Sequence, residues 1–213
     1  MRFNQQSFNR HLLNIGQSIS WRRSYACACV NPASGAPDPK HTVCNGKGRI
    51  WDKPLTSIIG ISAMKASPQL ATIGLWESGD VIGTIPENST MWDNCGRFDR
   101  VVLNNSVHAF SQPFIRGAPN EKVMFTVKSI DRCFWLDPET RAVVDGGIPL
   151  VGTGGTLDWP DGGEPANGVS YSLSGLKFDE YFIFDQLAQT RNEHSGMRLP
   201  KKVQLRKWDL FGR

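Results

Sequence analysis

Short apolar runs separated by turn-forming residues recur along the chain after residue 54. Within residues 122–130, for example, Val123, Phe125 and Val127 share one face, which is the two-residue period of a half-buried strand. Strands are expected at residues 57–62, 71–76, 80–85, 100–104, 122–130, 133–136, 169–173, 180–184 and 201–205. Many short strands at this spacing are typical of all-β domains. The sequence therefore predicts a mainly β fold, either a β-barrel or a β-sandwich.

The first 25 residues show two different periods. Phe8, Leu12 and Leu13 fall on one side of a short helix expected over residues 4–14, with Gly16 as its stop. From residue 15 to residue 25 apolar and polar positions alternate, which predicts a strand. We therefore expect an N-terminal segment, residues 1–53, with a short N-terminal helix, a strand and a cysteine-containing loop, and a β-rich domain over residues 54–213.

Residues 145–168 differ from the rest of this domain, because eight Gly and three Pro among 24 positions leave no room for a regular element. They predict a long loop. It is either a mobile surface excursion or an arm between subunits, with Leu157 and Trp159 as anchors that become ordered on assembly.

Composition narrows the class of protein. With 39% hydrophobic and 21% charged residues the chain is ordinary for a globular protein, and 21 Gly and 13 Pro disfavour a helical bundle. No apolar run is long enough to cross a membrane, and the first 16 residues lack the pattern of a secretory signal. We expect a soluble protein that is not exported and has no membrane partner. Its five cysteines are then metal ligands or buried apolar residues, since disulfides are rare in a reducing compartment.

The net charge of +4 is unevenly distributed. Residues 1–53 carry +6 and residues 191–213 carry +5, whereas residues 54–190 carry −7. This distribution is either chance clustering on a solvated surface or a basic face that meets an acidic partner or a phosphate backbone.

The strongest chemical signal lies in residues 27–48, CACVNPASGAPDPKHTVCNGKG. Cys27 and Cys29 are separated by one residue, and after an 11-residue spacer His41 and Cys44 are separated by two. Three thiolates and one imidazole form a complete ligand set for tetrahedral Zn²⁺. Side chains at i and i+2 of a strand point to the same face, so the first pair can share one ion at the end of the strand. The glycines that follow Cys44 permit positive φ close to the metal.

This spacing predicts a structural zinc site, because four protein ligands leave no open position for a reacting water. The alternative is that the four are small buried residues. Cys133, in an apolar strand, is expected in the core, and Cys95, in a turn, is expected as a free thiol. His11, His108 and His194 have no motif around them.

No catalytic pattern is found. The sequence lacks GxxxxGK[ST], HExxH, GxSxG and a strand-linked GxGxxG. Its seven tryptophans suit core or interface positions, with base stacking as the alternative. We therefore expect that the protein is not an enzyme.

The run LNIGQSISWRRSYACACVNPASGAPDPKHTVCNGKGRIW resembles the N-terminal signature of a group of tailed-bacteriophage and prophage virion proteins, and EYFIF with LPKKVQLRKWDLFGR resembles their C-terminal stretch. GRFDRV at residues 96–101 matches more weakly. The resemblance covers about 40 residues at the front and about 30 at the back. It implies a structural protein of the neck, where head and tail join, and zinc ligands at Cys27, Cys29, His41 and Cys44. At His41 the group is expected to have a cysteine, which changes Cys₄ to Cys₃His.

The sequence and the resemblance together predict a zinc-stapled virion subunit that is assembled in the bacterial host cytoplasm. Such a subunit forms a cyclic ring of roughly six or twelve copies between portal and tail, with other neck, portal and tail proteins as partners and DNA passing through its channel without sequence-specific contacts. Two alternatives stay open: a zinc-containing nucleic-acid-binding module, and a hydrolase such as a cell-wall lytic component of the tail.

Overall fold

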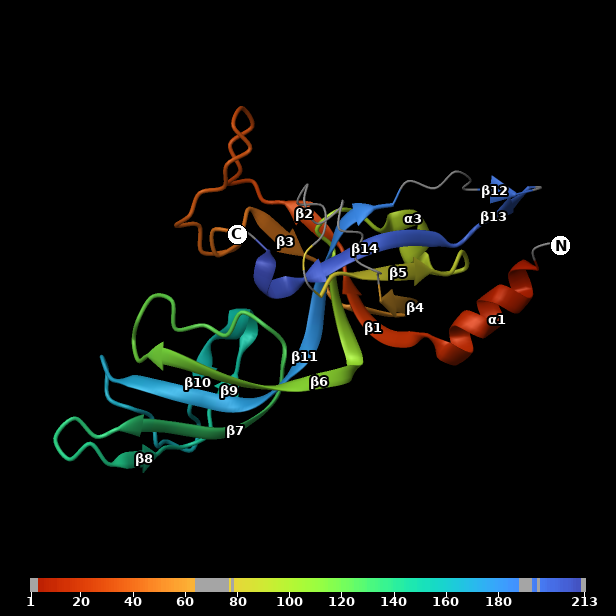
Figure 1. Cartoon of the computed structure of the whole chain (residues 1–213). Helices are drawn as coiled ribbons and strands as arrows, with labels where there is room; N and C mark the ends of the chain where they lie inside the picture. Colours follow the sequence, from red (N-terminus) through yellow and green to blue (C-terminus); the bar gives the residue numbers. More distant parts are fainter. Residues whose placement is uncertain (1–3, 64–76, 78, 188–192, 195, 212–213) are drawn as a thin grey trace. The chain divides into compact units, whose positions relative to one another are not determined.

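The computed structural model describes residues 4–63, 77, 79–187, 193–194 and 196–211 (Figure 1). These residues form two compact units. The first unit comprises residues 1–105 and 180–213, and the second comprises residues 106–179. The strand predicted at 71–76 lies outside the described residues. Among the described residues, no helix is long and apolar enough to span a membrane.

The first unit is built on a closed six-stranded barrel. Its strands are β1 (Gln17–Arg22), β4 (Leu55–Ala63), β5 (Val81–Ile85), β14 (Lys201–Lys207), the beginning of β6 (Arg100–Ile115) and the end of β11 (Ser170–Gln186). Their order is β14-β5-β4-β1-β6-β11, and a second pairing of β14, with β11, closes the circle. The predicted fold class is thereby confirmed, with the barrel chosen over the sandwich.

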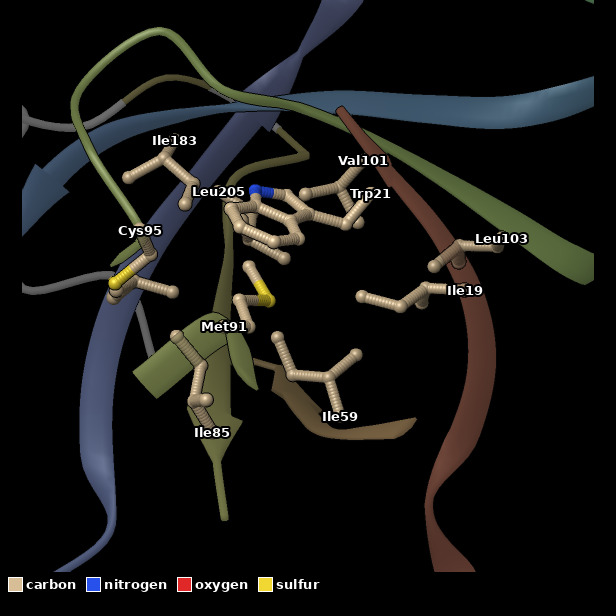
Figure 2. Packing of buried hydrophobic residues seen from close by; sticks show 11 residues of the cluster. Ile19, Trp21, Ile59, Ile85, Met91, Cys95, Val101, Leu103, Ile183 and Leu205 are labelled. Atoms are coloured by element: carbon tan, nitrogen blue, oxygen red, sulfur yellow. The ribbon is translucent and has the colours of Figure 1, made fainter. Parts of the chain in front are cut away.

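The barrel core follows from alternation along the strands. In β1, Ile19 and Trp21 point inward while their neighbours remain partly exposed. Figure 2 shows Met91, from α3 (Thr90–Asn94), beneath the Trp21 indole, with Ile59 from β4 reaching toward the same interior. The whole core consists of Ile19, Trp21, Ile59, Ile85, Met91, Cys95, Val101, Leu103, Ile183, Val203 and Leu205. Cys95 is a free thiol, as expected, but it is buried and belongs to this core.

The predicted N-terminal helix is confirmed as α1 (Gln5–Ile15). It begins at Asn4, whose side-chain oxygen accepts a hydrogen bond from the Ser7 N–H at 3.1 Å, and it ends at Gly16. The helix packs on β4 at Gly60, where an added Cβ would come within 2.7 Å of the Leu12 side chain. The glycine thus permits the close approach of helix and sheet.

The second unit is an antiparallel sheet formed by the end of β6, the beginning of β11, β7 (Val127–Leu136) and β8 (Val143–Asp145). A small hairpin, β9 (Leu150–Val151) and β10 (Leu157–Asp158), flanks the 3₁₀ turn η1 (Thr153–Gly155). The core of this unit comprises Phe110, Phe114, Val123, Cys133, Trp159, Tyr171 and Leu173. Cys133 is thus a core residue, as predicted.

Several expectations about strand boundaries were wrong. The runs at 169–173 and 180–184 belong to one strand, β11, and the run at 100–104 is only the beginning of the 16-residue β6. The runs at 122–130 and 133–136 also belong to one strand, β7, which begins only at Val127. The strand expected over residues 15–25 is divided, because Ile15 ends α1 and β1 and β2 (Ser24–Ala26) belong to different sheets. β11 continues through Gly175 because a register shift there absorbs the irregularity, and an added Cβ would lie 2.1 Å from the Ser129 carbonyl oxygen. Gly175 thus permits the close approach of β11 to β7 and does not end the strand.

The division into units also differs from the expected boundary at residues 53 and 54. β1 precedes that boundary and β4 follows it, yet they pair side by side in one barrel.

Residues 145–168 differ from expectation as well. Trp159 is buried in the core of its own unit and its indole N–H donates to the Gly147 carbonyl at 3.1 Å, while Leu157 packs on the same core. These two side chains are therefore not free to serve as anchors between subunits.

Candidate metal centre

The metal loop, which we define as residues 27–48, is closed at its base by a short two-stranded ladder. β2 (Ser24–Ala26) and β3 (Arg49–Trp51) pair antiparallel, with Ala26 opposite Arg49. The next pair of residues continues the closure, because the Cys27 N–H donates to the Gly48 carbonyl at 2.9 Å. The two ends of the loop are thereby held together at the edge of the barrel unit.

The four predicted ligands converge within this loop. The Sγ atoms of Cys27, Cys29 and Cys44 and a ring nitrogen of His41 all lie within 4.8 Å of one another. His41 Nδ1 is 3.5 Å from Cys27 Sγ and 3.4 Å from Cys44 Sγ, and the Sγ atoms of Cys29 and Cys44 are 3.5 Å apart. Tetrahedral zinc with bonds of ~2.3 Å to sulfur and ~2.0 Å to nitrogen requires ligand separations of ~3.5–3.8 Å. Three of the six separations are thus close to those that a single tetrahedral ion requires, and the other three are no longer than 4.8 Å.

The first pair of ligands reaches this arrangement by a route that the sequence did not predict. Strand β2 ends at Ala26, and Cys29 lies in a turn in which the Val30 N–H donates to the Cys27 carbonyl at 3.0 Å. The expected two-residue strand geometry at Cys27 and Cys29 is therefore wrong. The tight turn replaces it and also brings both sulfur atoms to the same side.

The second pair lies in a turn shaped by glycines. The N–H of Gly46 donates to the His41 carbonyl at 3.3 Å, and the N–H of Lys47 donates to the Cys44 carbonyl at 3.0 Å. Gly46 and Gly48 have φ values of 72° and 67°, as their position after Cys44 predicted. An added Cβ at Gly46 would meet the Pro39 carbonyl oxygen at 2.8 Å, so the turn also packs tightly against the spacer.

The electrostatics of the cluster distinguish its thiols. Desolvation opposes ionisation of Cys44, but hydrogen bonds from His41 and the Gly48 backbone outweigh it and lower the pKa of this thiol to about 6. Desolvation raises the pKa of Cys29 to about 11, assisted by the neighbouring thiols. Cys44 is thus better prepared than Cys29 to be a thiolate, which is the form that binds metal.

Few apolar contacts hold the metal loop together. Cys27, Cys44 and Gly48 are its only buried residues. The spacer is ordered by local polar contacts: the Asn31 side-chain oxygen accepts from the Ala33 N–H at 2.8 Å, and Asp38 Oδ1 accepts from the Lys40 N–H at 2.9 Å. Besides these turns and the close packing of Gly46 and Gly48 on the spacer, the liganding side chains supply the remaining internal contacts of the loop.

Asp99, which the sequence analysis did not single out, anchors the chain just before the loop. Its buried carboxylate accepts hydrogen bonds from the Trp21 indole N–H at 2.8 Å, the Ser24 N–H at 2.8 Å and the Gly96 N–H at 2.9 Å. Burial raises the pKa of Asp99. Only its position between two apolar runs, in GRFDRV, could have suggested this role.

Within the described parts of the chain, these four residues form the only grouping of His, Cys, Asp or Glu suited to hold a metal ion. His108 lies elsewhere, with its Nδ1 at 3.0 Å from Asp179 Oδ1. No protein-family model matches the chain, and no curated protein matches it in sequence.

Proposed function

We propose that the protein is an architectural subunit of a tailed-phage virion, stapled by a structural Zn²⁺ and assembled as a ring in the neck between portal and tail. The convergence of Cys27, Cys29, His41 and Cys44 on one point carries the proposal. The sequence resemblance to neck-region virion proteins supports it, and the same four residues occupy the ligand positions that the resemblance implies.

Zinc is the metal that this donor set favours. Three thiolates with one imidazole at tetrahedral spacing suit Zn²⁺, whereas Mg²⁺ and Ca²⁺ prefer oxygen ligands. Four protein ligands leave no position at which water could be activated, which supports a structural and not a hydrolytic role. We therefore propose that the ion organises the loop and takes no part in a reaction.

The distribution of charge supports assembly into a ring. Cyclic rings use interfaces in which one patch of a subunit meets a different patch of the next. Basic ends of +6 and +5 and an acidic middle of −7 give the chain segments of opposite sign that could supply such a pair of patches. A ring of this kind, placed in the neck of a virion, would have other neck, portal and tail proteins as neighbours and would let DNA pass through its channel.

A zinc-containing nucleic-acid-binding module is the second candidate. Lys47, Arg49 and Arg97 lie on or next to the metal loop, and none of them forms an ion pair with a described carboxylate. Such cations could contact phosphates, and the binding would then weaken steeply with salt.

Metal analysis combined with sedimentation tests the proposal. We expect one zinc per chain, its loss in Cys44→Ser, and self-association of the intact protein that weakens as ionic strength rises. Electron microscopy of the associated species should show closed rings. A metal-free protein that stays monomeric at both low and high salt would contradict the proposal. Salt-sensitive binding to DNA without self-association would favour the second candidate instead.

A further inference from the structure

A pocket of ≈ 630 Å³ opens beside the metal loop, within the first unit. One wall is formed by the loop itself, including Pro37 and Gly46–Gly48, and Phe98, Phe182 and Phe211 line the wall on the barrel side. This volume lies in the range of sites that hold a small molecule or a few side chains. We call it the cationic pocket, because Lys47, Arg49 and Arg206 line it and Arg97 lies beside it over the Phe98 ring, whereas Glu77 is the one acidic residue among the lining.

Basic groups already cover the aromatic faces. The guanidinium groups of Arg49 and Arg97 lie 4.5 Å and 5.0 Å from the centre of the Phe98 ring. Arg206 lies 3.6 Å from the centre of the Phe184 ring, and Lys47 Nζ lies 5.5 Å from that of Phe211. Stacking on a ring holds a guanidinium flat and leaves its edge N–H groups to donate outward. The pocket therefore presents hydrogen-bond donors with positive charge and not bare aromatic faces.

Most of this positive charge is not neutralised. Arg206 is paired with the buried carboxylate of Asp80 at 3.0 Å. In contrast, Arg49, Arg97 and Lys47 make no ion pair within the part of the chain that the structure describes. Because two of these cations are guanidinium groups, a carboxylate is a suitable ligand: it can accept two parallel hydrogen bonds from one guanidinium.

Two features favour an acidic peptide segment over nucleic acid. Bases bind single-strand proteins by stacking on free aromatic faces, and here basic groups lie over those of Phe98 and Phe184. The pocket is also concave and partly apolar, which suits a side chain that enters it better than a phosphate backbone that passes over a surface. The expected ligand is thus a carboxylate beside an apolar side chain.

The β9–β10 hairpin of the second unit offers this combination. Leu150 is 61% exposed and lies directly opposite Asp158, so the two side chains share one face of the hairpin. Ile148 is also exposed, at 45%. Asp158 and Asp161 are exposed and make no ion pair among the described residues.

We propose that the β9–β10 hairpin of one copy docks in the cationic pocket of a second copy, with Asp158 and Asp161 meeting Arg49 and Arg97 while Leu150 covers the apolar wall. The contact joins two different patches, so repeating it builds a ring or a filament. This inference rests on the ring-forming role proposed above and specifies its interface. A metal ion that orders the metal loop would also shape this interface, since the loop forms one wall of the pocket.

Sedimentation of charge-reversal variants of the full chain tests this contact. The pocket variant is Arg49→Glu with Arg97→Glu, and the hairpin variant is Asp158→Lys with Asp161→Lys. Each alone should weaken self-association at least ~10-fold, because like charges would then face each other, and the chain carrying all four changes should recover it. Lys53→Glu with Lys128→Glu, two exposed positions outside the contact, is the matched control for charge and should leave association nearly unchanged.

A mixing experiment adds a second readout. Each double variant alone should stay monomeric. In an equimolar mixture the Asp hairpin of one variant meets the Arg pocket of the other, and the Lys hairpin meets the Glu pocket, so both contacts are complementary and assembly from alternating copies should recover. Zinc content and circular dichroism verify folding, and Arg49→Gln with Arg97→Gln replaces the pocket variant if the reversal prevents folding.

The possible failures differ from one another. Self-association of the wild type that neither double variant disturbs would overturn this contact and leave the ring role standing, whereas a wild type that never associates would overturn both. If self-association is weakened in the pocket variant but not in the hairpin variant, the β9–β10 hairpin is not the segment that occupies the pocket. A pocket variant that still associates but no longer binds single-stranded DNA would assign the pocket to nucleic acid and overturn the inference.

Discussion

The barrel core and the metal loop belong to the same unit, yet they are held together by different means. The barrel buries a continuous cluster of apolar side chains from all six strands and α3, such as Ile59 and Leu205, which have no exposed surface. In the metal loop only Cys27, Cys44 and Gly48 are buried among 22 residues. Burial of apolar surface can therefore account for the order of the barrel, but the loop needs its four ligands. Variants in the two regions should consequently fail in different ways.

The largest effect on barrel stability is expected from truncation in its core. Leu205→Ala removes a side chain that is fully buried among strands, and it should lower the free energy of unfolding by about 2–5 kcal/mol. Leu55→Ala, in β4 but 54% exposed, is the matched control and should change it by less than about 0.5 kcal/mol. Urea unfolding followed by tryptophan fluorescence measures both. Equal losses in the two variants would contradict the placement of the core.

A smaller effect is expected at Asp99, where the barrel meets the strand that leads to the loop. Asp99→Asn weakens the acceptor shared by Trp21 and Ser24 and should cost about 1–3 kcal/mol. The change should also alter the dependence on pH. Because the pKa of Asp99 is raised in the folded state, the fold binds this proton more tightly than the unfolded chain does.

The sign of the pH effect follows directly. The stabilising contribution of protonated Asp99 is complete below the unfolded pKa and declines as pH rises through the higher folded pKa. Urea titrations at a series of pH values upward from about 4 should show this decline in the wild type, and the decline should be smaller in Asp99→Asn. An unchanged slope in the variant would show that another group is responsible.

The smallest effect on the barrel is expected from a change of ligand. His41→Ala should lose the metal but leave the free energy of unfolding of the barrel within about 1 kcal/mol, since His41 makes no contact with the barrel core. His41→Cys supplies a fourth thiolate in place of the imidazole and should retain one zinc per chain. Metal analysis and urea unfolding of both variants give the result. Collapse of the barrel in His41→Ala would mean that the two regions are not independent.

The sequence predicts the metal loop more completely than it predicts the barrel. Apolar alternation in residues 15–25 and a ligand set within 22 residues are local patterns, so the mainly β fold, the N-terminal helix and the grouping of Cys27, Cys29, His41 and Cys44 could be foreseen. Closure of the barrel could not, because β14 has to pair with β5 as well as with β11, and β5 lies far from β14 in sequence. The cationic pocket was missed for the same reason: Arg49, Phe98 and Phe211 meet only after folding.

The packing of Trp159 was predicted wrongly because the amino-acid composition of a segment indicates only its local backbone conformation. Eight glycines among residues 145–168 indicate turns, and Gly154, Gly155, Gly162, Gly163 and Gly168 do adopt positive φ. They do not reveal that the Val123 N–H donates to the Gly155 carbonyl at 2.8 Å, or that Tyr171 lies 5.8 Å from Trp159, ring centre to ring centre. These long-range contacts fold the segment back onto its own unit.

Hydrogen exchange read by mass spectrometry, with zinc bound and after its removal by a chelator, tests the central claim that a metal ion orders residues 27–48 while the barrel orders itself. Amide protection within the metal loop, including the Cys27 and Lys47 amides, should be lost without metal, whereas β1, β4 and β14 should keep theirs. Protection that persists in the loop, or that disappears from loop and barrel together, would contradict it.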